Sequence, residues 1–185
     1  MVDNKSKFYR VGYKCNPKRT AEIARVKVYL AGPFFNEEQR RRVDMAADFL
    51  YDNPTVQVIH CPFDFQSRNA SIDDDQNGFF GSNVWIQNTF QNDIFAMSTS
   101  DVGVFLDDLD DPDSGTYMEL GYMYSLHKPI IWVPFYKNTR DTYKINLMVA
   151  GGETNYIDGN TEFSKLAKFN FDHPQAETEL PFEVF

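Results

Sequence analysis

One short segment holds two carboxylates at a spacing that suits glycosidic chemistry. Asp113 precedes Glu119 by six residues, and the helix that we expect after Thr116 puts Glu119 in its first turn. Cleavage of a glycosidic bond needs one carboxylate at the anomeric carbon and an acid near the leaving group. Thr116-x-x-Glu119 is also a capping box, in which Glu119 only satisfies a free backbone N–H. The spacing alone leaves both interpretations open.

Two acidic loops could instead bind calcium. The run at residues 73–78 matches the first half of an EF-hand loop, but position 12 is Val84, where a bidentate Glu is required. A loop starting at Asp108 puts Glu119 at position 12 and Pro112 in the place of the third ligand. We therefore expect solvated acidic loops and no metal site.

The remaining candidate residues point to a flat, uncharged ligand. The turn at residues 31–35 has neither a G-x-G-x-x-G motif nor a P-loop lysine, so no nucleotide cofactor is expected. No histidine, His60 included, has a partner at catalytic or metal spacing. Six aromatic side chains near strand ends could stack on a purine or pyrimidine ring, although each could equally be core packing: Tyr29, Phe34, Phe35, Phe63, Phe65 and Trp85.

Strands and helices that alternate along the chain must position these residues. The pattern predicts strands at 26–31, 56–61, 102–106 and 129–135, and helices from an Asn36 cap to about Tyr51, from Ser82 to Met97, and after Thr116. Such alternation indicates an α/β fold: a single-domain, doubly wound (flavodoxin-like) parallel five-stranded sheet with helices on both faces.

The order of these elements also predicts where a ligand binds. Open parallel sheets bind ligands beyond the carboxyl ends of their strands. The segments 29–35, 62–66 and 107–119 each follow a predicted strand. We therefore expect them to converge on one crevice.

Composition limits the function classes. The chain has 185 residues, 42% of them apolar, which suits one globular domain. Its net charge of −9 argues against a nucleic-acid polymer as ligand. No apolar run is long enough for a membrane span, and no secretory signal is apparent. Two cysteines, Cys15 and Cys61, cannot build a disulfide framework, so we expect a cytoplasmic protein.

The charge is uneven along the chain. Residues 1–25 carry seven Lys/Arg and two Asp/Glu, a net +5, which leaves −14 for residues 26–185. We interpret residues 1–25 as a basic N-terminal extension and residues 26–185 as the functional domain.

From about Val26 to its C-terminus, the chain resembles the nucleoside 2-deoxyribosyltransferases of lactic acid bacteria. No single matching segment is specific, but their order and spacing together are. The segments are Val28-Tyr29-Leu30, Pro33-Phe34-Phe35, Pro62-Phe63-Asp64-Phe65-Gln66, Trp85, Gln91-Asn92-Asp93, Asp113-Ser114-Gly115, Glu119-Leu120-Gly121-Tyr122, Asn146-Leu147-Met148 and Phe169-Asn170-Phe171.

The resemblance implies transfer of a 2-deoxyribosyl group between bases through a covalent intermediate on Glu119, with no cofactor. Tyr29 would hydrogen-bond Glu119. Asp93 and Asp113 would contact the base or sugar, and one of them would protonate the departing base. The resemblance does not indicate which of the two donates the proton.

The resemblance further implies substrate contacts and an assembly. Gln66, like Phe34, would contact the substrate in the same chain. Asn146, Met148 and the terminal carboxylate of Phe185 would reach a neighbouring subunit's site, as in a homohexamer. The partners would be 2′-deoxynucleosides and free nucleobases, in nucleoside salvage, without a nucleic-acid polymer or a membrane.

Base specificity and rival functions stay open. Gln66 resembles the class that exchanges purines and pyrimidines, whereas residues 127–129 and 158–163 resemble the purine-restricted class, and we favour the broad class. One rival is a hydrolase of nucleosides or their 5′-monophosphates, although Asp113 would repel a phosphate. Another is a non-catalytic protein that binds nucleosides or calcium.

Overall fold

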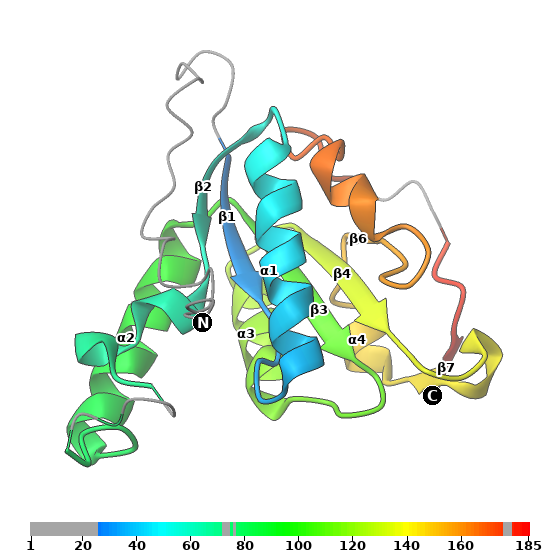
Figure 1. Cartoon of the computed structure of the whole chain (residues 1–185). Helices are drawn as coiled ribbons and strands as arrows, with labels where there is room; N and C mark the ends of the chain where they lie inside the picture. Colours follow the sequence, from blue (N-terminus) through cyan, green and yellow to red (C-terminus); the bar gives the residue numbers. More distant parts are fainter. Residues whose placement is uncertain (1–25, 72–74, 76, 176–178) are drawn as a thin grey trace, which may run out of the picture.

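A parallel five-stranded sheet organises the chain in the order β2-β1-β3-β4-β6 (Figure 1). The computed structural model describes residues 26–71, 75, 77–175 and 179–185, so the predicted extension of residues 1–25 lies outside the described residues. The strands are β1 (Val26–Ala31), β2 (Val56–His60), β3 (Val102–Asp108), β4 (Ile130–Phe135) and β6 (Asn155–Tyr156).

Helices cover both faces of this sheet. Helix α1 (Glu37–Asp52) crosses the front face in Figure 1, and α3 (Ser114–Ser125) lies behind it, with α2 (Asn83–Thr99) on the same side as α3. The two faces bury separate apolar clusters, one packed under α1 and one under α2 and α3. Burial on both faces explains why all six residues of β4 are buried and nearly all are apolar.

The arrangement confirms the predicted doubly wound fold. Numbered along the chain within the sheet, the strand order is 2-1-3-4-5, which is the flavodoxin-like order. The four strands located from the sequence are all present, and β3 runs two residues further than predicted, through Asp107 and Asp108. The fifth strand, β6, has two residues, which is too short to show a periodic pattern.

Helix α1 begins as predicted, but α3 does not. The Asn36 side chain accepts a hydrogen bond from Gln39 N and caps α1. For α3, the N-cap is Asp113, and the helix already includes Ser114, before Thr116. The alternative that Thr116 and Glu119 form a capping box is therefore wrong, because the Asp113 carboxylate caps the helix three residues earlier.

Shorter elements complete the described chain. Within the described residues, no helix is long and apolar enough to cross a membrane. A second, two-stranded sheet pairs β5 with β7 near the C-terminus. These elements are η2 (Pro62–Phe65), η3 (Ser67–Asn69), η4 (Arg140–Thr142), β5 (Lys144–Ile145), α4 (Leu147–Ala150), η5 (Phe163–Ala167) and β7 (Glu183–Val184).

Candidate active site

A cleft of about 280 Å³ opens where β1 and β2 end beside α2 and the start of α3. This is the crevice expected for an open parallel sheet, at the point between β1 and β3 where the strand order reverses. Gly32 lets the end of β1 pack closely against β3, because a Cβ at this position would lie 2.8 Å from Leu106 Cβ. The lining includes five aromatic side chains, Phe34, Phe35, Phe63, Phe80 and Trp85, and three carboxyl groups, Asp93, Asp113 and Glu119.

Tyr29 and Glu119 form the central contact of the site. The hydroxyl of Tyr29, a fully buried residue of β1, donates to Glu119 Oε1 on α3 at 2.8 Å. Burial raises the pKa of Glu119 to about 8, and the Tyr29 hydrogen bond acts in the opposite direction by stabilising the carboxylate. Burial and the Glu119 charge raise the pKa of Tyr29, so the phenol stays a donor.

Asp93 lies in the same cleft on α2 and differs from Glu119 in its hydrogen bonding. Its Oδ1 atom is buried and accepts no hydrogen bond from any described residue. Burial raises the pKa of Asp93 to about 7. Because no described residue donates a hydrogen bond to Oδ1, Asp93 is suited to hold a proton near neutral pH.

Asp113 also faces the cleft, but it serves as the N-cap of α3. Its Oδ1 accepts from Gly115 N at 3.1 Å, and its Oδ2 accepts from Thr116 N at 2.9 Å and Thr116 Oγ1 at 2.8 Å. A carboxylate at a helix N-terminus is stabilised by these donors and by the helix dipole. Asp113 therefore fixes the helix that carries Glu119.

The predicted base-contacting residues are present in the cleft. Gln66 lines it and donates through Nε2 to Pro62 O at 2.9 Å, which fixes the side-chain amide. The ring of Phe34 packs 4.8 Å from that of Phe63. Phe80, which no sequence pattern singled out, joins this wall beside Trp85, with ring centroids 4.5 Å apart.

Three predicted site residues are not brought to this cleft. Asn146 caps α4 through a hydrogen bond from Met148 N, and Met148 is 75% exposed. Phe185 is 66% exposed and joins the same region, where its carbonyl accepts from Leu147 N at 3.1 Å. Within one chain, therefore, Asn146, Met148 and Phe185 form their own surface.

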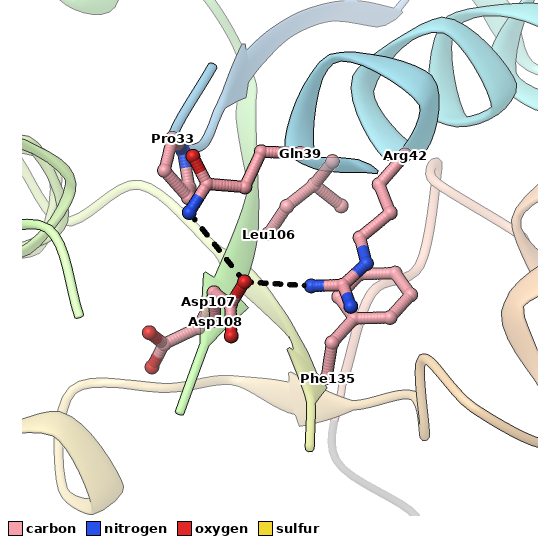
Figure 2. Close-up of a pocket in the computed structure, with 7 residues that line it drawn as sticks. All are labelled: Pro33, Gln39, Arg42, Leu106, Asp107, Asp108 and Phe135. Carbon is pink, nitrogen blue, oxygen red and sulfur yellow. Dashed lines mark hydrogen bonds and ion pairs between the residues drawn. The ribbon is translucent and has the colours of Figure 1, made fainter. Parts of the chain in front are cut away.

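A buried polar network, missed from the sequence, supports the cleft from the α1 side (Figure 2). Arg42 Nη1 lies 2.9 Å from Asp108 Oδ2, and the Arg42 guanidinium stacks 4.4 Å from the ring of Phe135. Gln39 Nε2 donates to the same Asp108 oxygen at 3.5 Å, and Gln39 Oε1 accepts from Phe35 N at 3.0 Å. Gln39 thus ties the aromatic turn of the cleft to the end of β3.

The acidic side chains at the end of β3 and in the loop that follows it accept hydrogen bonds from other parts of the protein. Asp107 accepts from Trp132 Nε1 at 2.9 Å and from the Tyr117 hydroxyl of α3 at 3.0 Å. Asp110 accepts from the Tyr143 hydroxyl at 2.7 Å and from Lys137 N at 2.8 Å. Asp107 and Asp108 are buried at the end of β3, whereas residues 110–112 are exposed, as expected for a solvated loop.

The calcium alternative gains no support from the described residues. They contain no group of three or more His, Cys, Asp or Glu side chains placed to hold a metal ion. In the loop that starts at Asp108, the Asp108 carboxylate is already paired with Arg42. Asp73, of the other candidate loop, lies outside the described residues.

Comparisons with known proteins agree on one family. The family model described as nucleoside 2-deoxyribosyltransferase matches residues 28–156. A nucleoside deoxyribosyltransferase of Limosilactobacillus fermentum is 49% identical over 168 residues, covering 91% of this chain and 99% of the relative. One from Lactobacillus leichmannii is 30% identical over 164 residues, covering 86% and 94%. A solved 2-deoxyribosyltransferase of Bacillus psychrosaccharolyticus has a TM-score of 0.65 at 27% identity, covering 83% and 99%.

The raised pKa of Glu119 predicts a pH-dependent stability. Its pKa of about 8, against an ordinary 4.5, means that its contribution is fully present below about pH 4.5 and is lost as pH rises through about 8. Glu119→Gln lacks this titration. Between about pH 5 and 9, the free energy of unfolding of the wild type should therefore fall by more than about 1 kcal/mol beyond the fall in Glu119→Gln. Urea unfolding measures this, with Glu179→Gln as an exposed control. Equal slopes for wild type and Glu119→Gln would contradict it.

Proposed function

The chain belongs to the nucleoside 2-deoxyribosyltransferase family, and from this premise we propose that it transfers the 2-deoxyribosyl group of a 2′-deoxynucleoside to another purine or pyrimidine base. The observation that carries the proposal is the Tyr29–Glu119 hydrogen bond of 2.8 Å at the wall of an aromatic cleft that also holds Asp93. The reaction needs no metal or organic cofactor, because side chains supply the nucleophile and the acid.

The reaction proceeds by two displacements at C1′ of the sugar. In the first, a Glu119 oxygen forms a bond to C1′ while the bond from C1′ to the base nitrogen breaks, and the base leaves with a proton from Asp93. In the second, the nitrogen of a new base attacks C1′, the Glu119 ester bond breaks, and Asp93 takes up the proton that this base loses. Two inversions give net retention of configuration.

The hydrogen bonds around the two carboxyl groups support these roles. Each group has a pKa raised by burial, and the charge of Asp93 raises that of Glu119 further, so the pair favours a state with a single proton. Tyr29 donates to Glu119 and so stabilises its ionised form, whereas Asp93 Oδ1 has no donor among the described residues. The pKa of Glu119, about 8, lies above that of Asp93, about 7, so the pKa values alone do not place the shared proton on Asp93. We assign it to Asp93 because the nucleophile must be ionised, and of these two groups Glu119 has the donor, the Tyr29 hydroxyl, that stabilises its charge.

The same comparison favours Asp93 over Asp113 as the general acid. Asp113 already accepts three hydrogen bonds from the first turn of α3. Protonation of Asp113 would weaken this cap. Asp113 instead holds α3 in place and lies close enough to the cleft to meet the base or sugar.

The cleft also bears on base specificity. Gln66 and the aromatic residues line it, whereas residues 127–129 and 158–163 do not. The segments that resemble the purine-restricted class therefore lie outside the lining of this cleft. This supports the broad class, which accepts both purines and pyrimidines.

We propose that the working form is a homohexamer with shared sites. A second hollow of about 140 Å³ borders Glu119 and Asp93 from the side of α2 and α3, where Phe90 and Met118 are exposed. Asn146, Met148 and Phe185 form an exposed surface that lies outside the cleft around Glu119. A neighbour's copy of that surface would close the hollow over the sugar, with Asn146 and the terminal carboxylate near its 5′-hydroxyl. We assign the enzyme to cytoplasmic nucleoside salvage.

Base exchange tests the function directly. Protein incubated with thymidine plus adenine, and separately with 2′-deoxyinosine plus adenine, should form 2′-deoxyadenosine in both mixtures, followed by chromatography. Glu119→Ala should reduce the rate by more than about 10³-fold, while Glu162→Ala should not. Product only from 2′-deoxyinosine would contradict the broad class. Free base without exchange would indicate a hydrolase, and no turnover would contradict an enzymatic role.

The two aspartates can be separated by the leaving group. For a nucleoside with an ordinary base, Asp93→Asn should lower kcat by about 10²–10⁴-fold. For a nucleoside whose base departs without protonation the loss should be far smaller, because that base does not need the acid. Asp113→Asn should lower kcat less and by a similar factor for both bases. Steady-state kinetics on the paired substrates measures this. A leaving-group-dependent loss in Asp113→Asn alone would reverse the assignment.

A further inference from the structure

His60, the last residue of β2, lies directly behind the Tyr29 ring. Parallel pairing of β1 and β2 places Tyr29 opposite His60. Their rings are stacked, with centroids 5.6 Å apart and planes within 11°. On its other side His60 stacks on Phe65, with centroids 4.4 Å apart and planes within 14°. The imidazole is thus held between two nearly parallel aromatic rings.

This stack joins the base-facing turn to the nucleophile. Phe65 ends the short helix η2, in which Pro62 and Phe63 line the cleft, and Gln66 follows it at once. Asn92 of α2 donates to Phe65 O at 3.4 Å and ties the turn to the helix that carries Asp93. At the other end of the stack, the Tyr29 hydroxyl donates to Glu119.

A flat ring at position 60 determines where the Tyr29 hydroxyl lies. The hydroxyl is the atom of Tyr29 farthest from the backbone, so a small tilt of the ring moves it most. A stacked aromatic face restricts that tilt, whereas a branched aliphatic side chain of similar size offers no flat surface. Catalytic contacts are sensitive at this scale, since a misplacement of about 1 Å can lower a rate about 10²-fold.

The chemistry of His60 suits such a place. The side chain is 6% exposed, and burial lowers the pKa of His60 to about 4. The imidazole is therefore uncharged near neutral pH and adds no charge beside Glu119 and Asp93.

We propose that His60 is a positioning residue for the transfer reaction: its ring, held between Tyr29 and Phe65, fixes the Tyr29 hydroxyl against Glu119 and links this contact to the base-facing turn. The inference rests on the proposed function. The Tyr29 hydroxyl orients the Glu119 carboxylate in the first displacement and stabilises it as the leaving group in the second. Loss of the stack should therefore lower kcat and leave KM for the acceptor base largely unchanged.

A matched pair of variants tests this in the full-length protein. His60→Leu removes the flat face and His60→Phe keeps it, while both remove the imidazole nitrogens. In the exchange of thymidine with adenine, His60→Leu should lower kcat by about 10- to 100-fold with KM for adenine within roughly threefold of wild type. His60→Phe should retain kcat within roughly threefold.

The Tyr29→Phe background shows whether the effect passes through the hydroxyl. With that hydroxyl absent, His60→Leu should lower kcat by less than roughly threefold. If His60→Leu does not give folded protein, as judged by Tm, Phe65→Leu removes the outer ring instead. Its loss of kcat should likewise disappear in the Tyr29→Phe background.

Two results would overturn the inference while the wild type remains active in exchange. One is an equal kcat for His60→Leu and His60→Phe. The other is a loss of kcat caused by His60→Leu, or by Phe65→Leu in its place, that is just as large when Tyr29→Phe is also present. A wild-type protein that performs no exchange would instead refute the proposed function itself.

Discussion

The hydrogen bond between Tyr29 and Glu119 is the contact on which the rest of the site depends. A carboxyl group in a buried cleft resists ionisation, as the raised pKa of Glu119 shows, and the hydrogen bond from the Tyr29 phenol lowers this penalty. The two residues are 90 positions apart in the chain. They meet because β1 lies inside the parallel sheet and α3 follows its neighbour β3 across the carboxyl edge.

The acidic residues from the end of β3 to the start of α3, residues 107–113, hold α3 at that edge. Asp107 and Asp113 bind α3 through Tyr117 and through the first backbone amides of the helix. Asp108 joins β3 to α1 through Arg42, and Asp110 joins the segment to Tyr143. In sequence this run of carboxylates resembles a calcium-binding loop. In the structure the carboxylates instead accept hydrogen bonds from other groups of the protein. Their combined effect is to place Glu119 within reach of Tyr29.

Much of the fold could be predicted from the sequence because strands buried on both faces leave continuous apolar runs, as in β4. The start of α3 could not be predicted, because Asp113 and Thr116 are both good N-cap residues and lie three positions apart. Phe34, Gln66, Asp113 and Glu119 do share one cleft, as the order of strand ends indicated, and Asp93 of α2 joins them there. The links from Gln39 to Asp108 and from His60 to Tyr29 span 69 and 31 positions, and no local pattern reveals such pairs. Asn146, Met148 and Phe185 lie on an exposed surface outside this cleft, so a single chain does not test the roles predicted for them.

The central claim is that Glu119 carries the sugar during transfer. The most direct measurement mixes the protein with a 2′-deoxynucleoside in the absence of an acceptor base, quenches with acid, and records the intact mass and the peptide map. The mechanism predicts a mass increase of one deoxyribosyl group on the peptide that contains Glu119, and its disappearance when adenine is added before the quench. Two results would contradict it. One is an adduct on another peptide, and the other is release of free base with no adduct from protein that performs exchange at its normal rate.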